Sequence, residues 1–174
     1  YCGDGATSTG DFHEALNSAG TFRTPNVFVV QNNQWAISMP RQRQTAAPTL
    51  AQKAVAHGFP GIMVDGNDVL AMYIATQEAV GRARRGEGPT LIEAFTYRMG
   101  AHTTSDDPTK YRVSAEVEVW KLRDPIERLR TLLGRAHGIP TAFFAECEEE
   151  ADSVGADLRA RCLALPDPTP ESMF

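Results

Sequence analysis

Two side chains with hard oxygen atoms follow neighbouring strands of the expected sheet. Asp4 lies in a Gly3-Asp4-Gly5 turn after a short strand end, and Asn33 follows the apolar segment 27–31. A right-handed strand-helix-strand unit brings both side chains to the carboxyl edge of a parallel sheet. One carboxylate, one amide oxygen and a backbone carbonyl or two suit Mg²⁺, which also holds phosphate oxygens. The spacing therefore predicts a Mg²⁺ and diphosphate site at this edge.

The two halves of this pattern are common when taken separately. Gly-Asp-Gly is more often a plain turn, and Asn-Asn pairs are frequent in loops. A helix after Gly5 would point its unpaired N–H groups towards the same position, which favours a diphosphate. The joint spacing of the turn and the asparagine, rather than either motif, carries the prediction.

A second candidate region is the long segment from Tyr97 to Arg112. It has no helix or strand periodicity, and connections of this length without secondary structure are often functional. It contains His102 and Arg98. The other histidines, at positions 13, 57 and 137, fall in helical stretches where surface or packing roles are usual. His102 is therefore the candidate catalytic histidine.

Two groups of acidic residues have a simpler interpretation than catalysis or metal binding. Asp106 and Asp107 resemble a pair of acid-base carboxylates, but we expect them to hold the loop through turns or through Tyr111 and Arg112. The four glutamates between positions 146 and 150 are expected to form a solvated helical face, since hard metals take their ligands from closed loops.

The elements that must position these residues alternate between strand and helix, which predicts an α/β fold with a parallel sheet and helices on both faces. The apolar run 27–30 does not alternate, as is typical of a strand covered on both faces. The expected strands are 27–31, 61–65 and 90–96, and the expected helices are 9–19 with Gly20 as its stop, 49–57, 68–83, 125–133 and 141–163. We expect residues 1–112 to form part of a domain that includes the loop, and residues 113–174 to form a helical C-terminal extension.

Composition excludes several classes of protein. The 174 residues carry 22 acidic and 17 basic side chains, so nothing favours a nucleic acid partner. The three cysteines form no CxxC pair, and their odd number favours a reducing compartment, so a cytoplasmic location is expected. The apolar runs are too short to cross a bilayer, and no membrane association is predicted.

The chemical motifs also resemble a known family. The Gly-Asp-Gly turn followed by Asn32-Asn33 resembles the thiamine-diphosphate motif, and the segment 10–38 is similar to the α subunit of the E1 component of 2-oxo acid dehydrogenase complexes. The segment 97–108, with Tyr111 and Arg112, is similar to the active-site loop of that family. The resemblance is nearly continuous from Gly3 to Arg112 and weaker afterwards. It implies the thiamine-diphosphate-binding fold and, within it, the half that binds the diphosphate.

The resemblance implies a specific role for each residue of the first region. Asp4 and Asn33 would be side-chain ligands of Mg²⁺, and Trp35 would contribute its backbone carbonyl. Three small residues of the first turn would lie against the diphosphate: Gly3, Gly5 and Ala6.

The same resemblance implies roles nearer the reacting atoms. Ile37 would touch the thiamine diphosphate near its rings. Arg98 would pair with the terminal phosphate, for which a planar fork of donors is suited. His102 would face the thiazolium ring and take part in acyl transfer onto a lipoyl group, as suits a side chain that exchanges protons near neutral pH.

The implied activity is that of an oxidoreductase that works in a complex. Thiamine diphosphate and Mg²⁺ would serve the oxidative decarboxylation of a 2-oxo acid, and the acyl group would pass to the lipoyl arm of the E2 acyltransferase. The β subunit would hold the aminopyrimidine end, so that activity needs an α2β2 heterotetramer and the chain alone is inert. We further expect the chain to be a C-terminal fragment, because this family has a substantial region before Gly3.

Several alternatives remain open. Segments 12–17 and 29–38 resemble bacterial pyruvate-type subunits, whereas 99–107 is closer to the branched-chain type, for which 3-methyl-2-oxobutanoate is the substrate. Pyruvate ranks slightly ahead. A chain that keeps the fold without chemistry, as an interaction module, is the alternative of another class. A nucleotide-binding dehydrogenase has no support, because residues 3–8 are not a GxGxxG motif and Gln31, not an acidic residue, ends the following strand.

Overall fold

The computed structural model describes residues 1–173. The chain divides into two compact units, residues 1–129 and a second unit that begins at Arg130. Within the described residues, no helix combines the length and the apolar character that a membrane span requires. The three cysteines, Cys2, Cys147 and Cys162, are free thiols.

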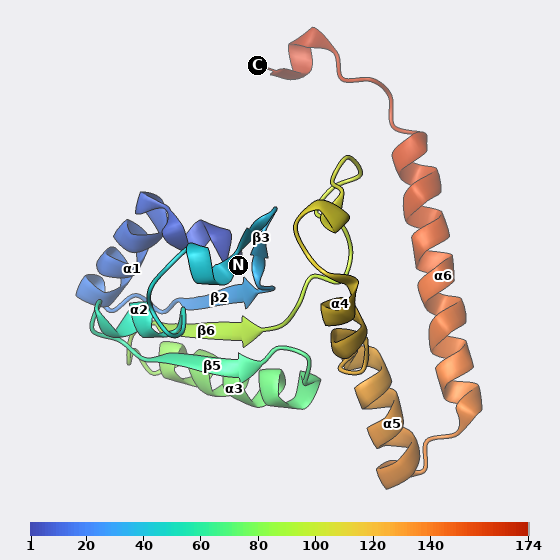
Figure 1. Cartoon of the computed structure of the whole chain (residues 1–174), viewed down its shortest axis with the longest axis horizontal. Helices are drawn as coiled ribbons and strands as arrows, with labels where there is room; N and C mark the ends of the chain where they lie inside the picture. The colour runs from blue at the N-terminus through green and yellow to red at the C-terminus, as the bar shows by residue number, and fades with distance from the viewer. Residues whose placement is uncertain (174) are drawn as a thin grey trace. The chain divides into compact units, whose positions relative to one another are not determined.

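A four-stranded parallel sheet forms the centre of the first unit (Figure 1). Its order is β1 (Cys2–Gly3), β2 (Val27–Asn32), β6 (Thr90–Phe95) and β5 (Gly61–Asp65). Gly3 is paired with Gln31, and Asn32 with Phe95. Because all the strands are parallel, the residues after β1, β2 and β6 emerge at one edge. The predicted α/β fold is confirmed.

Helices cover both faces of this sheet because the strands carry apolar residues in both directions. On one face, α1 (Gly10–Phe22) and α2 (Gln52–Val55) meet the central strands. The buried cluster there comprises Phe12, Leu16, Val30, Leu50, Ala51, Ala54, Phe59 and Leu91. The alternate strand residues Val29 and Ile92 are also buried and point the other way. That face belongs to α3 (Val69–Arg84), which buries three alanines.

Short elements connect the sheet to the candidate residues. The turn after β1 is a 3-10 helix, η1 (Gly5–Ser8), and β2 leads into a hairpin of β3 (Trp35–Ala36) and β4 (Met39–Pro40), then η2 (Arg41–Arg43). After β6 the chain forms η3 (Pro108–Lys110), α4 (Ser114–Lys121) and α5 (Pro125–His137).

Several expected helix boundaries are wrong: the helix expected at 49–57 is limited to residues 52–55, the helix expected at 125–133 continues to residue 137, and the end of the first helix also differs. Gly20 does not end α1, which continues to Phe22 and ends at Arg23 with a φ of 50°. Gly20 has another purpose: a Cβ at this position would stand 2.1 Å from the carbonyl oxygen of His57. The glycine therefore allows α1 to approach the segment after α2. By contrast, Asp68 caps α3 as predicted, with its carboxylate accepting from the N–H groups of Leu70 and Ala71 at 3.0 Å.

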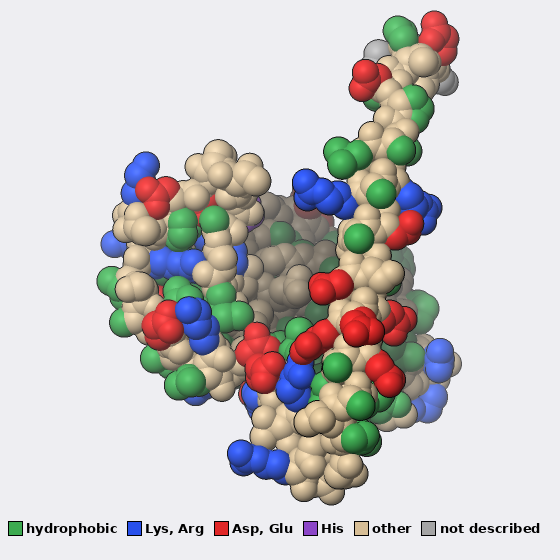
Figure 2. All heavy atoms as spheres, turned by 90° about the vertical axis from the view of Figure 1, so that its right-hand side faces the viewer, with side chains coloured by type: hydrophobic (Ala, Val, Ile, Leu, Met, Phe, Trp, Pro, Cys, Tyr) green, Lys and Arg blue, Asp and Glu red, His purple; other side chains and the backbone are tan. Residues whose placement is uncertain are grey.

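The second unit is helical and begins at Arg130, within α5, rather than at residue 113. It contains α6 (Thr141–Leu163) and η4 (Pro170–Met173). The glutamates at 146 and 148–150 are exposed, and acidic side chains gather along one stretch of α6 in Figure 2. Within residues 1–173, no three or more His, Cys, Asp or Glu side chains come together in a group that could hold a metal ion. The prediction of a solvated acidic face is confirmed.

Candidate functional site

Asp4 is a buried carboxylate directly after β1, with 1% of its surface exposed. The N–H and hydroxyl of Thr7 bond to the backbone carbonyl of Asp4, at 3.1 and 2.8 Å, and fix the turn of η1. The carboxylate itself accepts a hydrogen bond from Gln44, with 2.6 Å between Nε2 and Oδ2. A buried anion with a neutral amide donor is a suitable ligand for a cation.

The turn after β2 carries the second set of oxygen atoms. Asn33 is half-buried, and its Oδ1 accepts from the N–H of Trp35 at 3.1 Å. Gln34 and Ile37 have φ angles of 73° and 56°, in the left-handed region that non-glycine residues rarely adopt. Such backbone geometry is held by its surroundings and is frequent at functional sites.

A buried network below this turn was not predicted from the sequence. Asn32 and Glu93 are each 1% exposed, and Asn32 Nδ2 donates to Glu93 Oε1 at 2.6 Å. The other carboxylate oxygen of Glu93 accepts from the N–H of Ala51 at 2.8 Å. Glu93 thus ties β6 to the turn that carries Asn33. The available signal was a glutamate in the middle of a strand whose other residues are apolar or small.

The first turn fits close against the hairpin. A Cβ on Gly5 would stand 2.7 Å from the Cβ of Ala36, so that only glycine fits here without a shift. Ala6 and Gly3 are exposed at the same turn. The helix α1 begins only at Gly10, because Thr9 is extended with φ −85° and ψ 155°. The N–H groups next to Asp4 are therefore those of η1 rather than those of a long helix.

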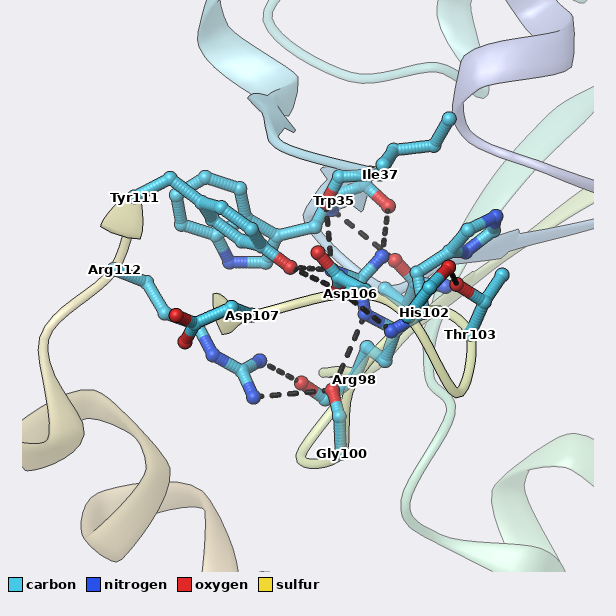
Figure 3. Close-up of polar contacts among 12 residues, drawn as sticks. Trp35, Ile37, Arg98, Gly100, His102, Thr103, Asp106, Asp107, Tyr111 and Arg112 are labelled. Carbon is cyan, nitrogen blue, oxygen red and sulfur yellow. Dashed lines mark hydrogen bonds and ion pairs between the residues drawn. The ribbon is translucent and has the colours of Figure 1, made fainter. Parts of the chain in front are cut away.

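The loop from Tyr97 to Arg112 is held by its own polar groups (Figure 3). Arg112 donates to the carbonyls of Arg98, Met99 and Gly100. Asp106 Oδ2 accepts from the N–H of His102 at 2.8 Å and from the hydroxyl of Tyr111 at 2.6 Å. These two bonds, with the charge of Arg98, hold the pKa of the Asp106 carboxyl below its usual value.

The expected structural contacts of the two loop aspartates are present. Asp107 caps η3, because its carboxylate accepts from the N–H of Thr109 at 3.1 Å and from its hydroxyl at 2.6 Å. These bonds lower the pKa of Asp107. For Tyr111 the pKa is raised, first by burial and then by its bond to Asp106. The prediction that these aspartates hold the loop is confirmed.

Arg98 joins the loop to the hairpin. Its Nη1 donates to the carbonyl of Trp35 at 3.1 Å, and its Nη2 donates to the carbonyl of Ile37 at 2.6 Å and lies 2.8 Å from the hydroxyl of Tyr111. Figure 3 shows the guanidinium among these groups. Three predicted site residues, from two segments about 60 positions apart in the sequence, therefore meet. The Trp35 carbonyl, an expected metal ligand, is bonded here to the fork of an arginine.

His102 is hydrogen-bonded to this group through its main chain. Its N–H bonds to Asp106, whereas the residue is exposed at the tip of the loop beside Thr103 (Figure 3). Ile37 is also exposed, with 54% of its surface accessible. An exposed imidazole and an exposed branched apolar side chain near Arg98 form a surface that a ligand or a partner can cover.

Two cavities adjoin the hairpin. One of about 440 Å³ lies between the hairpin, β6 and α4, and its aromatic lining residues are Trp35, Phe95, Tyr97 and Trp120. A second, of about 360 Å³, lies between Trp35 and the segment 109–113. Trp35 borders both and packs against Tyr111 with ring centroids 5.3 Å apart. The hairpin and loop thus enclose a partly aromatic region beside the polar site.

Comparison with known proteins identifies the family. The family model described as dehydrogenase E1 component matches residues 1–157. The chain belongs to the dehydrogenase E1 family. This agrees with the resemblance of the turn, the asparagine pair and the loop, and with the parallel sheet that carries them.

The E1 relatives include subunits with two different substrates in their names. The 3-methyl-2-oxobutanoate dehydrogenase subunit alpha of Mycobacterium tuberculosis is 55% identical over 174 residues, which is 100% of this chain and 47% of the relative. The pyruvate dehydrogenase E1 component subunit alpha of Acholeplasma laidlawii is 59% identical over 149 residues, or 85% of this chain and 42% of the relative. The same subunit of Staphylococcus aureus is 58% identical over 134 residues, or 76% and 36%. The chain thus spans less than half the length of these E1 relatives.

Proposed function

We propose that this chain supplies the diphosphate-binding part of an E1 α subunit. With a β subunit, thiamine diphosphate and Mg²⁺, it would serve the oxidative decarboxylation of a 2-oxo acid in the cytoplasm. The observation that carries this proposal is the buried Asp4 carboxylate at the carboxyl edge of the sheet, in register with the Asn32-Asn33 turn. Membership of the E1 family supports it.

The residues present fit the Mg²⁺ and diphosphate group. Asp4, Asn33 and the Trp35 carbonyl offer the hard oxygen atoms that Mg²⁺ prefers. Gly5 packs against Ala36, which holds the first turn beside the hairpin, and the exposed small residues Gly3 and Ala6 leave room for a diphosphate at this turn. In this structure Arg98 donates hydrogen bonds to the carbonyls of Trp35 and Ile37. With the ligands bound, the cation would take the place of Arg98 at the Trp35 carbonyl, and the guanidinium of Arg98 would bind the terminal phosphate instead.

Bound thiamine diphosphate supplies the carbon nucleophile and the electron sink for loss of CO₂ from the 2-oxo acid. The protein's part is placement. Ile37 would contact the cofactor near its rings and exclude water, and Arg98 would fix the phosphate end. His102 would hold or move a proton at its imidazole during acyl transfer to the lipoyl group, for which its exposed position beside the loop is suitable.

The proposed division of labour extends to the rest of the complex. Residues 1–112 would form the cofactor part and its loop, and residues 113–174 a helical extension. The β subunit would bring the other end of the cofactor, in an α2β2 assembly, and E2 would bring the lipoyl arm. This chain by itself would then be inactive.

Pyruvate is our first choice of substrate, because segments 12–17 and 29–38 resemble pyruvate-type subunits. The branched-chain acid 3-methyl-2-oxobutanoate is the second candidate, favoured by the relative named for it that aligns with all 174 residues. Turnover of both acids by the complete α/β pair, compared as kcat/KM, decides between them. A higher value for the branched-chain acid would reverse our order.

The proposed function is tested by calorimetry on the complete α/β pair. Wild type should bind thiamine diphosphate only with Mg²⁺ present, and Asp4→Ala should weaken this binding by at least about 100-fold, because the buried carboxylate would be a direct ligand of the metal ion. Unchanged binding by Asp4→Ala would contradict the metal assignment. If neither protein binds the cofactor while the pair still assembles, the alternative of a non-catalytic interaction module is favoured.

A further inference from the structure

Gln44 is a neighbour of Asp4 that no sequence motif singled out. It lies just after η2, in the loop that follows the hairpin, 40 positions from Asp4. Its Nε2 donates to Asp4 Oδ2 at 2.6 Å and also lies 3.2 Å from the carbonyl of Met39. One amide group therefore connects the hairpin to the buried carboxylate.

Hydrogen bonds fix both backbone groups of Gln44, its N–H and its carbonyl. Its N–H donates to the carbonyl of Arg41 at 3.0 Å, and its own carbonyl accepts from the hydroxyl of Ser8 at 3.3 Å. Ser8 ends η1, the turn that begins next to Asp4. A side chain anchored in this way holds its amide in one place, so the position of the Asp4 carboxylate depends on it.

The side-chain oxygen of Gln44 lacks a hydrogen-bond partner among the described residues. Gln44 Oε1 is buried, yet it accepts no hydrogen bond from any of residues 1–173. It lies 3.8 Å from the place where a Cβ on Gly5 would stand, in the corner between Asp4 and the glycine turn. Buried amide oxygens are nearly always satisfied, so an unsatisfied one beside a carboxylate indicates a missing donor. A water molecule held by a cation is a donor of the required kind.

We propose that Gln44 is a positioning residue for the metal ion, an inference that rests on the proposed function. Its Nε2 holds one oxygen of Asp4, which leaves the other oxygen for Mg²⁺. Its Oε1 accepts a hydrogen bond from a water in the coordination shell of the ion. Residues that orient a metal ligand in this way typically change metal affinity by about 10–100-fold when they are replaced.

The experiment measures, by calorimetry, how thiamine diphosphate binding to the complete α/β pair depends on the concentration of Mg²⁺. Gln44→Met keeps the length of the side chain but neither donates to Asp4 nor accepts from water. We expect it to raise the Mg²⁺ concentration for half-saturation by about 10–100-fold. The matched control is Gln52→Met on α2, where the glutamine is exposed, and it should stay within about twofold of wild type.

The outcomes separate this inference from the proposed function. If Asp4→Ala abolishes binding and Gln44→Met leaves the Mg²⁺ requirement unchanged, the role of Gln44 is refuted and the proposed function stands. If Asp4→Ala has no effect either, the proposed metal site itself fails. Thermal unfolding without ligand is measured in parallel. The Gln44→Met protein could instead unfold at a lower temperature and bind thiamine diphosphate more weakly by the same factor at every Mg²⁺ concentration. That result would assign Gln44 a structural role alone and would also refute the proposal.

Discussion

The two regions of the candidate site are held by different kinds of polar contact. In the asparagine turn, residues 32–35, the supporting groups are buried: Asn32 and Glu93 are each 1% exposed and bond across two strands. In the loop of residues 97–112, the supporting groups are only partly buried: Arg112 donates to backbone carbonyls, and Asp106, whose side chain is 10% exposed, accepts from a hydroxyl and an N–H. Water therefore reaches the loop contacts more readily than the contacts beneath the asparagine turn.

Because of this difference in burial, we expect the asparagine turn and the loop to contribute differently to the stability of the fold. Unpaired buried groups are costly, so the turn is as rigid as the sheet beneath it. Partly exposed hydrogen bonds within one loop contribute less to global stability than buried bonds between strands, so we expect the loop to open locally while the fold persists. We therefore expect changes at the turn to affect folding and changes in the loop to affect local order.

The largest effect is expected from Glu93→Ala. The substitution leaves the Asn32 amide and the Ala51 N–H without their acceptors in the core, and each unsatisfied donor costs about 1–3 kcal/mol. Urea unfolding of the complete assembly should show a loss of roughly 2–6 kcal/mol. The control Glu118→Ala, at an exposed glutamate paired with Lys121, should lose no more than about 1 kcal/mol. Equal losses in the two variants would remove the contrast between buried and exposed contacts.

A smaller and more local effect is expected from Arg112→Lys. A single ammonium cannot replace a fork that reaches three carbonyls. Amide hydrogen exchange should become about tenfold faster for residues 99–106, while the amides of β2 and β6 keep their rates. Arg84→Lys, at an exposed end of α3, is the control. Faster exchange in the sheet would show that the loop is part of the rigid core after all.

The smallest effect is a pH dependence that Asp106 gives to the loop. Its pKa is lowered, first by the N–H of His102 and then by the Tyr111 hydroxyl, so the ionised form favours the closed loop. The stabilisation of the closed loop by ionised Asp106 is fully present above the ordinary aspartate pKa of about 3.9. It is lost as the pH falls through the lowered pKa of Asp106 in the folded protein. Asp106→Asn should therefore flatten the change in tryptophan emission on acidification below about pH 4. Asp152→Asn, on the exposed surface of α6, should leave that change as in wild type, and a transition that Asp106→Asn leaves unaltered would exclude Asp106 as its source.

Most of the fold could be predicted because its signals are local. The unbroken apolar run 27–30 predicts a strand buried on both faces, and Asp68 predicts the start of α3. Gly20 was interpreted wrongly for the same reason: a glycine near a helix end has a local meaning as a stop, while its close approach to His57 lies outside any local window.

The sequence by itself determined the main strands and helices, the placing of Asp4 and the Asn33 turn at one edge, and the loop that carries Arg98 and His102, but not the hairpin of β3 and β4 or helix α4. These follow from periodicity and from motifs within short segments. Only the tertiary structure decided which groups support them: Glu93 bonds to Asn32 across 61 positions, Gln44 to Asp4 across 40, and Arg98 to Trp35 across 63. A hydrogen bond between such distant residues depends on the packing of strands and turns. No pattern within a short stretch of chain contains that information.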